Sequence, residues 1–533
     1  MRTGDERVNE AAPPGARQAQ AAPVLRNVYA CLVHESQECV VDLVRNLRCL
    51  DPESQVLLYN GGPDARLLEP RSCFEKLGAL VHPDPRPVDG RTLHEFALAC
   101  MRHANDNLSC DVLTIVDSDQ LALRAGWSSV LAQHLANKTR VGLLGGGVGG
   151  TAPERQPKTT RVTPAIGAWQ ELPLWRPLLS RFPGGEAQFP RWAAWPGMVF
   201  TAEASRALVH WFDEDATLRR IVRDSRMWAK EQIVFPTLTA LLGLRVLPSP
   251  ASQEYIKYQV TYDPSDAEAA LANEQAYWIH PVARRYDDAT RGVVRVRFDQ
   301  YRAPNAARSA PIVGPRIAVA SDELRQPILR EMRNIDGWLT PSEADLLISA
   351  THRALSDCPH VRALVEVGSY CGRATTVIGS VVRATRGEAR VWAIDPHDGF
   401  VGAHDRGLER VEPTLGRLRA NIEAAKLEPF VEIVQSKAHE VPWAEPLCFL
   451  LVDGLHDYPN VLKDFSHFEP HLVDGALAAF HDYTEYFPGV PAFVDELCAS
   501  GRYEAVGRVR SLIVLRKLPD RSPPSLASAA PRG

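Results

Sequence analysis

The chain has 533 residues, 45% hydrophobic and 23% charged, which is the composition of an ordinary folded protein. One hydrophobic core rarely organises more than about 250–300 residues, so this length predicts two domains. The net charge of -5 gives no electrostatic reason to expect nucleic acid as a partner. The ten cysteines form no CxxC pair, which favours reduced thiols. With neither a signal-peptide pattern nor an apolar run long enough to span a membrane, we expect a cytoplasmic protein without a transmembrane segment.

Composition divides the chain into five parts. Three stretches rich in Ala, Pro and polar residues predict a disordered N-terminal tail, a linker and a disordered C-terminal tail. The boundaries are 1–23 for the first tail, 24–302 for the first domain, 303–322 for the linker, 323–517 for the second domain and 518–533 for the last tail. Both domains alternate short β-branched runs with helical patterns, which is typical of α/β folds. We therefore predict two doubly wound domains.

The first domain begins with strands predicted at 28–34 and 55–60, separated by a helix at 40–50. A helix at 92–105 follows, and then a strand at 111–117. The last strand is apolar almost throughout, which predicts burial on both faces.

That strand ends on two carboxylates, Asp117 and Asp119. An Asp-x-Asp turn often only caps the next helix or forms an Asx-turn. Carboxylates at the end of a rigid strand can instead hold Mn²⁺ or Mg²⁺, which bridges the phosphates of a nucleotide-sugar and offsets the charge that grows on the departing diphosphate. From the residues alone, both interpretations stay open.

Four stretches of this domain, "VYACLVHESQE", "TIVDSDQ", "WPGMVF" and "KEQIVFPTLTALLG", resemble a glycosyltransferase of the A fold type. The resemblance covers about residues 26–290 and implies a nucleotide-sugar donor. It also implies that Asp117 and Asp119 bind the metal, that His280 completes the metal site, and that Glu231 removes a proton from the acceptor hydroxyl.

Several of these residues also suit a purely structural role. Glu231 is equally well interpreted as a solvated helix carboxylate, and His280 as a loop histidine packed by its neighbours. Trp192, Trp195 and Met198 suit either an apolar shelf for a sugar ring or an ordinary core. The run Gly145–Gly150 matches GxGxxG, but the sequence after it, "TAPERQPKTT", has no helical periodicity. We therefore expect a mobile loop over the donor site there and no dinucleotide site.

The second domain contains five predicted strands with helical patterns between them. They lie at 362–368, 390–396, 431–436, 447–454 and 475–482. A glycine-rich turn, Glu366-Val-Gly-Ser-Tyr-Cys-Gly372, follows the first of them. Gly368 permits a tight turn, and Gly372 lets a ligand approach the N-terminus of the next helix. The second strand ends in Asp395, which can accept hydrogen bonds from ribose hydroxyls. The pair suits either a dinucleotide or S-adenosylmethionine.

The ExGxxxG turn, the strand-terminal Asp395, "LLVDGLHDY" and "FHD" together resemble a class I S-adenosylmethionine-dependent methyltransferase of the macrocin O-methyltransferase-like subgroup. The resemblance spans nearly all of residues 338–516 and implies a Rossmann-like fold. It places Glu366, Gly368 and Gly372 at the methionine part of the cofactor and Asp395 at the ribose. Ser436 and Lys437 fall beside the adenine, where the family usually has Gly-Asp.

Three polar residues, Asp453, His481 and Asp482, follow two neighbouring strands. Two carboxylates and an imidazole suit Mg²⁺, which would lower the pKa of a substrate hydroxyl. Relatives often carry three carboxylates, so His481 or His456 acting as a general base is an alternative. A structural role also remains, with Asp453 capping a helix and the histidines bonded to buried carbonyls.

Taken together, these patterns predict a bifunctional enzyme. The first domain would transfer a sugar from a nucleotide-sugar to a glycan or natural-product acceptor, and the second would methylate a hydroxyl of a sugar or small molecule. Two alternatives stay open: the first domain as a non-catalytic glycan-binding module, and a hydroxylase-like use of the second fold.

Overall fold

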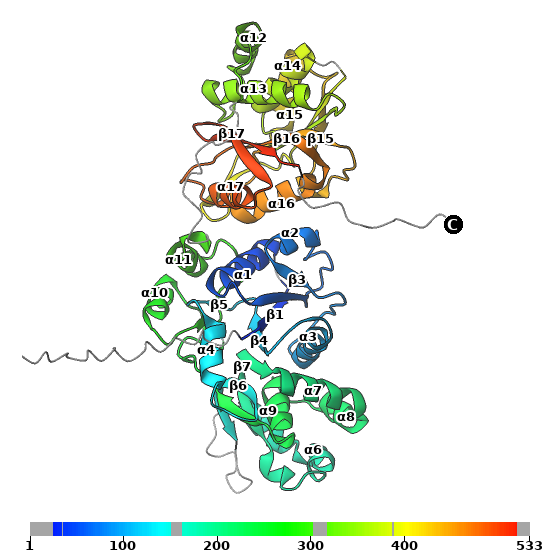
Figure 1. Cartoon of the computed structure of the whole chain (residues 1–533), viewed down its shortest axis with the longest axis vertical. Coiled ribbons are helices and arrows are strands. Elements are labelled where there is room, and N and C mark those ends of the chain that lie inside the picture. The colour runs from blue at the N-terminus through cyan, green and yellow to red at the C-terminus, as the bar shows by residue number, and fades with distance from the viewer. Residues whose placement is uncertain are drawn as a thin grey trace, which may run out of the picture.

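The computed structural model describes residues 25–34, 36–150, 163–258, 260–301, 317–385 and 388–519. They form two lobes along the longest axis of the molecule, each built around a seven-stranded sheet (Figure 1). The predicted N-terminal tail, and most of the predicted linker and C-terminal tail, lie outside the described residues. Within the described ranges, no helix has both the length and the apolar character needed to cross a membrane.

The first sheet is mixed. From edge to edge its strands are β3 (Ala79–Val81), β2 (Gln55–Asn60), β1 (Asn27–Val33), β4 (Val112–Asp117), β7 (Arg191–Thr201), β6 (Val141–Gly150) and β8 (Arg245–Pro248). Strands β1 to β4 run parallel, as predicted, but β7 is antiparallel to both β4 and β6. The prediction of a doubly wound domain therefore holds for the β3-to-β4 half and is corrected for the rest.

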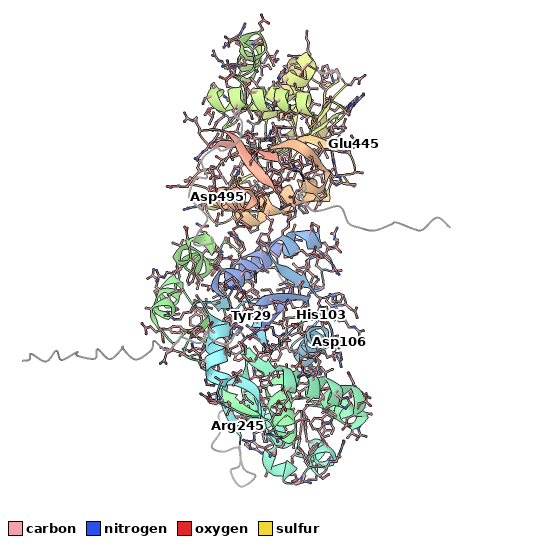
Figure 2. All side chains as sticks on the ribbon, in the orientation of Figure 1. Tyr29, His103, Asp106, Arg245, Glu445 and Asp495 are labelled. Atoms are coloured by element: carbon pink, nitrogen blue, oxygen red, sulfur yellow. The ribbon has the colours of Figure 1, made fainter. Side chains whose placement is uncertain are left out.

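Helices cover both faces of this sheet, and their apolar side chains form two separate cores. The helices are α1 (Gln37–Leu50), α2 (Arg71–Lys76), α3 (Leu93–Asn107), α4 (Trp127–Leu135), α5 (Thr163–Gln170), α6 (Leu172–Leu179), α7 (Ala202–Glu214), α8 (Ala216–Asp224), α9 (Glu231–Leu241), α10 (Pro264–Ala272) and α11 (Ala289–Arg297). A short pair, β5 (Leu121–Ala122) and β9 (Trp278–Ile279), ties the end of the lobe to the segment after β4. Tyr29 illustrates the density of this packing (Figure 2): its ring is buried and its hydroxyl donates to Asp51 at 2.7 Å.

The glycine run is not a loop. It forms the second half of β6 and pairs with β7, with Gly149 opposite Trp192. A Cβ on Gly149 would lie 2.3 Å from the Trp192 ring, and one on Gly146 would lie 1.8 Å from the Gln253 side chain. The glycines therefore make room for large side chains that arrive from other segments, and the expectation of a mobile loop was wrong. The run "TAPERQPKTT" that follows the glycines, residues 151–160, lies outside the residues that the structure describes.

The second sheet has the order β14 (Val431–Val434), β11 (Arg390–Ile394), β10 (Ala363–Val367), β15 (Leu447–Val452), β16 (Leu472–Phe480), β18 (Leu512–Lys517) and β17 (Tyr503–Val509). The first five are the predicted strands and run parallel. Two further features were not predicted: the antiparallel strands β17 and β18, and the hairpin β12 (Phe400–Ala403) to β13 (Gly407–Arg410). The helices are α12 (Asp322–Met332), α13 (Pro341–Asp357), α14 (Arg373–Thr385), α15 (Leu415–Ala424), α16 (Tyr458–Phe468) and α17 (Gly489–Ala499).

The lobes meet where α1, α2 and α11 face α16 and α17 (Figure 1). The buried guanidinium of Arg45 lies 3.4 Å from the ring centroid of Tyr458 and 3.2 Å from the carboxylate of Glu496. Lys76 forms a second ion pair across the boundary, with Glu469. One apolar cluster also continues from the first lobe into the second. Because a buried charge is costly unless it is paired, these contacts define a specific interface.

Candidate active sites

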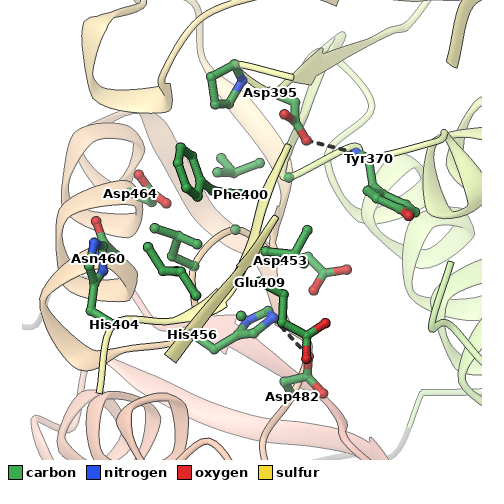
Figure 3. A pocket seen from close by; sticks show the side chains of 18 of the residues that line it. Tyr370, Asp395, Phe400, His404, Glu409, Asp453, His456, Asn460, Asp464 and Asp482 are labelled. Carbon is green, nitrogen blue, oxygen red and sulfur yellow. Dashed lines mark hydrogen bonds and ion pairs between the residues drawn. The ribbon is translucent and has the colours of Figure 1, made fainter. Parts of the chain in front are cut away.

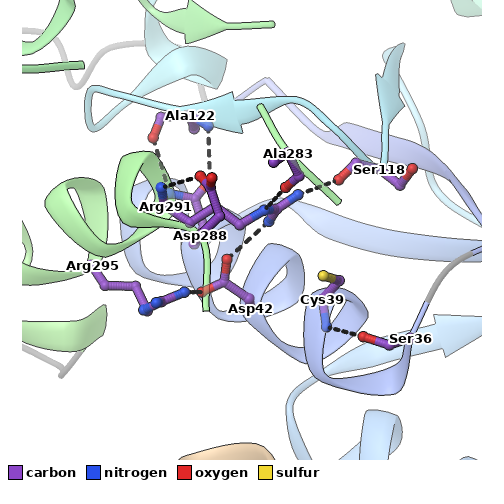
Figure 4. Close-up of polar contacts among 10 residues, drawn as sticks. Ser36, Cys39, Asp42, Ser118, Ala122, Ala283, Asp288, Arg291 and Arg295 are labelled. Carbon is purple, nitrogen blue, oxygen red and sulfur yellow. Dashed lines mark hydrogen bonds and ion pairs between the residues drawn. The ribbon is translucent and has the colours of Figure 1, made fainter. Parts of the chain in front are cut away.

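The turn that carries Asp117 and Asp119 is held by residues far away in the sequence (Figure 4). The fully buried side chain of Arg291, in α11, donates from Nη2 to the Ser118 carbonyl at 2.7 Å and from Nη1 to Asp42 at 2.9 Å. The backbone N–H of Val282 donates to the Asp119 carbonyl. The turn is therefore fixed at the carboxyl edge of the sheet. Arg291 and Asp42 were not predicted from the sequence. The only pattern in the sequence that could have revealed them is a charged residue on the side of each helix that otherwise faces the core.

The structure brings Asp117, Asp119 and His280 together, with one ligand atom from each within 4.8 Å of the others. His280 Nε2 lies 3.2 Å from Asp119 Oδ1 and 3.8 Å from Asp117 Oδ2. On the other side of the ring, Nδ1 lies 3.0 Å from the Lys257 carbonyl, which favours a proton on Nδ1 and leaves Nε2 facing the carboxylates. Two carboxylates and an imidazole fit a divalent cation such as Mn²⁺ or Mg²⁺.

The electrostatics of this cluster depend on nearby cations. Burial raises the pKa of Asp117 to about 6, although His280 counteracts part of the rise. Burial alone would also raise the pKa of Asp119, but His280 and Arg284 outweigh it and the pKa is lowered. Arg284 Nη2 lies 2.9 Å from Asp119 and its side chain is 43% exposed. Positive charge at this site therefore favours the ionised carboxylates, and part of that charge sits on a side chain near the surface.

Glu231 begins α9 and is 1% exposed, which excludes the interpretation as a solvated carboxylate. Burial raises its pKa to about 8, and the charge of Asp117 adds to that rise. The raised pKa favours the protonated form of Glu231, and in that form its carboxyl group cannot act as the base. Trp195 donates to Asp117 Oδ1 at 3.1 Å and, like Met198, is buried. Both residues belong to the core, whereas Trp192, the third residue of the predicted shelf, is only partly buried.

The glycine turn of the second lobe is shaped by close backbone packing. Gly368 and Gly372 both have φ of +88°, which disfavours any other residue. A Cβ on Gly368 would lie 2.1 Å from the Asp453 carbonyl oxygen, and one on Gly372 would lie 2.5 Å from Leu418. Glu366 is buried behind the turn and accepts a hydrogen bond from Thr375, and burial raises its pKa to about 8.

A cavity of about 810 Å³ opens at the carboxyl ends of β10, β11, β15 and β16 (Figure 3). The predicted residues that line it are Gly368, Asp395, Lys437, Asp453, His456, His481 and Asp482. Glu366, Gly372 and Ser436 are not among its lining residues. Asp395 accepts hydrogen bonds from the backbone N–H of Tyr370 at 2.9 Å and of His397 at 2.6 Å. The cavity thus collects most of the predicted site from the ends of five strands, since Lys437 follows β14.

Asp453, His456 and Asp482 form a second group whose ligand atoms lie within 4.8 Å of one another. His456 Nε2 lies 3.1 Å from Asp482 Oδ2 (Figure 3). This donor set also fits a divalent cation. The histidine in the group is His456, which was predicted as a base. His481, predicted as a ligand or as an alternative base, lies beside it.

His481 lies between three carboxylates. Its Nδ1 is 3.3 Å from Asp453 and 3.4 Å from Asp482, and its Nε2 is 3.7 Å from Glu343. Burial alone would lower the pKa of His481, but these carboxylates raise it well above its usual range. The pKa of Glu343 is correspondingly lowered. A protonated imidazole has no free lone pair, so in this state His481 can neither bind a metal nor accept a proton. Sequence reasoning missed Glu343, which the pattern T-P-S-E marks only as part of a helix cap.

Residues 365–483 match the family described as "Methyltransferase domain". Among solved structures, the chain is similar to the O-methyltransferase NovP (17% identity, 36% of this chain and 88% of that chain, TM-score 0.30). It is also similar to CalS11, a TDP-rhamnose 3'-O-methyltransferase of calicheamicin biosynthesis (14% identity, 38% of this chain and 96% of that chain, TM-score 0.27). A third similar structure is the methyltransferase PaMTH1 of Podospora anserina (12% identity, 38% of this chain and 89% of that chain, TM-score 0.26). With TM-scores this low, these similarities do not indicate the substrate of this protein. The family match identifies a methyltransferase domain in the second lobe.

Proposed function

We propose that the second lobe transfers the methyl group of S-adenosylmethionine to a hydroxyl oxygen of a small molecule. The observation that carries this proposal is that the methyltransferase-domain match, residues 365–483, contains the strand ends that form the 810 Å³ cavity. In the reaction the hydroxyl oxygen forms a bond to the methyl carbon, the carbon–sulfur bond breaks, and the hydroxyl proton leaves to a base. The acceptor and a base must therefore meet at the cofactor in one cavity.

The cofactor fits the wall formed by Gly368, Asp395 and Lys437. The Gly368 turn lets the backbone approach a ligand at the N-terminus of α14, and Asp395 offers a carboxylate to ribose hydroxyls. Ser436 turns its hydroxyl to the Lys437 carbonyl at 3.2 Å, which leaves Lys437 as the candidate beside the adenine. When bound, the cofactor supplies an electrophilic methyl group next to these residues.

Deprotonation of the acceptor is assigned to the Asp453, His456 and Asp482 group. These three would hold Mg²⁺, which would favour the ionised hydroxyl. Without an ion, His456 is the side chain in the group that can accept a proton, and Asp482 orients it through the 3.1 Å contact. His481 acts as a fixed cation that holds Asp482 in its ionised form.

Calorimetry with S-adenosylhomocysteine tests this assignment. The wild-type protein should bind it, and Asp395→Asn should weaken binding by about 10-fold or more, since hydrogen bonds to charged groups contribute about 1.5–3 kcal/mol. Absence of binding to the wild-type protein would remove the methyltransferase proposal and would leave the hydroxylase-like alternative in place.

A second function, metal-dependent transfer of a sugar from a nucleotide-sugar by the first lobe, is favoured by the Asp117, Asp119 and His280 group. The strands β3, β2, β1 and β4 put this group at the carboxyl edge of a parallel half-sheet, where ligands bind in α/β folds. The chain would then be a bifunctional enzyme acting on a glycan or natural product.

Binding of a nucleoside diphosphate, UDP or dTDP, with and without Mn²⁺ separates this function from a glycan-binding module. Catalytic use predicts Mn²⁺-dependent binding that falls by about 100-fold or more in Asp119→Asn, because the cation mediates the contact to the phosphates. A glycan-binding module would show no nucleotide binding in either form.

A further inference from the structure

The wall of the methyltransferase cavity crosses the boundary between the lobes. Glu38, in the first turn of α1, lines the cavity together with Asn460, Lys463 and Asp464 of α16. Glu38 Oε1 lies 3.9 Å from Lys463 Nζ, and the two side chains are 20% and 16% exposed. Figure 3 shows Asn460 and Asp464 on the α16 side of the cavity, away from the wall that carries Tyr370. A residue of the first lobe therefore belongs to the cavity of the second.

The position of Glu38 is fixed by the interface. The Ser36 hydroxyl accepts a hydrogen bond from the Cys39 N–H and caps α1 (Figure 4). Arg45, two helical turns after Glu38, lies on the same face of α1 and is held by Tyr458 and Glu496. Because α1 cannot rotate without breaking the contacts of Arg45, Glu38 keeps facing α16.

Three partly exposed aromatic side chains line the cavity together with the Glu38–Lys463 pair and further charged residues such as Glu409 and Asp482. Trp338, Phe400 and Tyr486 line the same cavity with rings that are 62%, 47% and 67% exposed. Such rings bind the apolar face of a ligand and can attract a cation, but they offer nothing that attracts an anion. The Glu38–Lys463 distance is at the outer limit of an ion pair, so each group can still contact a third charge. An ammonium on the acceptor would favour Glu38, and a carboxylate would favour Lys463.

We infer that Glu38 and Lys463 form a charge-sensing pair shared by the two lobes, and that Glu38 is a specificity-determining residue for the acceptor of the methyl group. The inference rests on the proposed methyl transfer. With both charges present, their opposite effects on a charged acceptor partly offset each other. Removal of either charge exposes the other, so the two single substitutions should change acceptor preference in opposite directions.

The test uses the full chain, labelled S-adenosylmethionine, and phenyl glycosides of glucose, glucosamine and glucuronic acid. The ratio of kcat/KM for the glucuronide over the glucosaminide should rise about 3- to 10-fold in Glu38→Gln, as expected for one charge acting across several ångströms of partly hydrated protein. It should fall by a similar factor in Lys463→Gln and return toward the wild-type ratio in the double variant. Glu53→Gln, an exposed control in the same lobe, should leave the ratio unchanged.

Binding of S-adenosylhomocysteine distinguishes the two ways to fail. If the wild-type protein does not bind it, the proposed function is wrong. If all variants bind it equally but the ratio does not move, the inference about Glu38 is overturned.

A second measurement needs no acceptor and covers the case in which none of the glycosides is methylated. In Glu38→Cys, the rates of reaction with an anionic and a cationic methanethiosulfonate are compared by mass spectrometry at that cysteine. Lys463 should favour the anionic reagent, and Lys463→Gln should lower the anionic-to-cationic ratio about 3- to 10-fold. Glu53→Cys should show no such change. An unchanged ratio at position 38 would overturn the inference.

Discussion

The two lobes place two aspartates and a histidine at the same edge of their sheets, but they neutralise them differently. In the first lobe, Asp119 is paired with His280 and with Arg284, whose side chain is 43% exposed. In the second, Asp453 and Asp482 contact His481, which is 4% exposed and also faces Glu343. Part of the positive charge in the first cluster therefore sits near the surface, whereas in the second it sits on a buried histidine whose pKa is raised by the carboxylates around it. Similar donor sets can therefore be balanced by a half-exposed arginine in one place and by a buried histidine in the other.

The largest expected effect concerns the ion pair beneath the first cluster. Arg291→Met leaves Asp42 buried without its main partner, which should lower the free energy of unfolding of the first lobe by about 3–5 kcal/mol. Urea denaturation followed by tryptophan fluorescence measures it. Arg285→Met, which removes an exposed arginine from the same segment, serves as the matched control and should cost less than about 1 kcal/mol. Equal losses in the two variants would contradict the role given to Arg291.

The second lobe should show a pH dependence that comes from Glu366. The pKa of Glu366 is about 8 in the folded state, above the ordinary glutamate value of 4.5, so the folded state binds more protons between these values. Its contribution to stability is therefore full below about pH 4.5 and is lost as the pH rises to about 8, a change on the order of 5 kcal/mol. Glu366→Gln should remove this slope while keeping an acceptor for Thr375. Urea denaturation of the wild-type protein and of Glu366→Gln at pH 5, 6.5 and 8 measures this pH dependence. If the free energy of unfolding changes with pH equally in both proteins, the assignment to Glu366 is refuted.

His481→Gln tests whether the second cluster contains a permanent cation. Without the imidazolium, Glu343 and Asp482 lose a partner, and stability at pH 7 should fall by about 2–3 kcal/mol. Added Mg²⁺ should then raise the melting temperature of the variant more than that of the wild-type protein.

The matched substitution in the first lobe, His280→Gln, should act in the opposite sense. It removes a metal ligand, so the stabilisation by Mn²⁺ should shrink. Thermal shift with and without the ions measures both variants, and equal ion effects on His481→Gln and wild type would contradict the comparison.

The smallest effect compares the N-terminal caps of α1 in the first lobe and α13 in the second. Ser36→Ala removes a single N-cap bond from α1 and should cost about 1 kcal/mol. Thr340→Ala breaks a reciprocal capping box whose Glu343 also bonds Ser511, so it should cost more than Ser36→Ala. Differential scanning calorimetry should show a smaller shift for Ser36→Ala, and the reverse order would be a contradiction.

Local sequence pattern was sufficient for the frame of each site. The apolar run before Asp117, the turn from Glu366 to Gly372 and the five parallel strands of the second lobe were all predicted, because each depends on neighbours within a few residues. The positions of Asp117, Asp395 and Asp453 at sheet edges follow from the same patterns. A parallel strand that ends in an aspartate places that carboxylate at the carboxyl ends of the strands, whatever the position of the strand in the sheet.

Only the tertiary structure decided what surrounds those residues. The run from Gly145 to Gly150 became a strand because Trp192 and Gln253 arrive from elsewhere, and the Asp117 turn is held by Arg291. Likewise, the three carboxylates around His481 come from α13 and from the ends of β15 and β16, and Glu38 reaches the second lobe's cavity from the first. Burial and charge at a point are sums over segments distant in sequence, so periodicity and motif spacing, which are local, do not contain them.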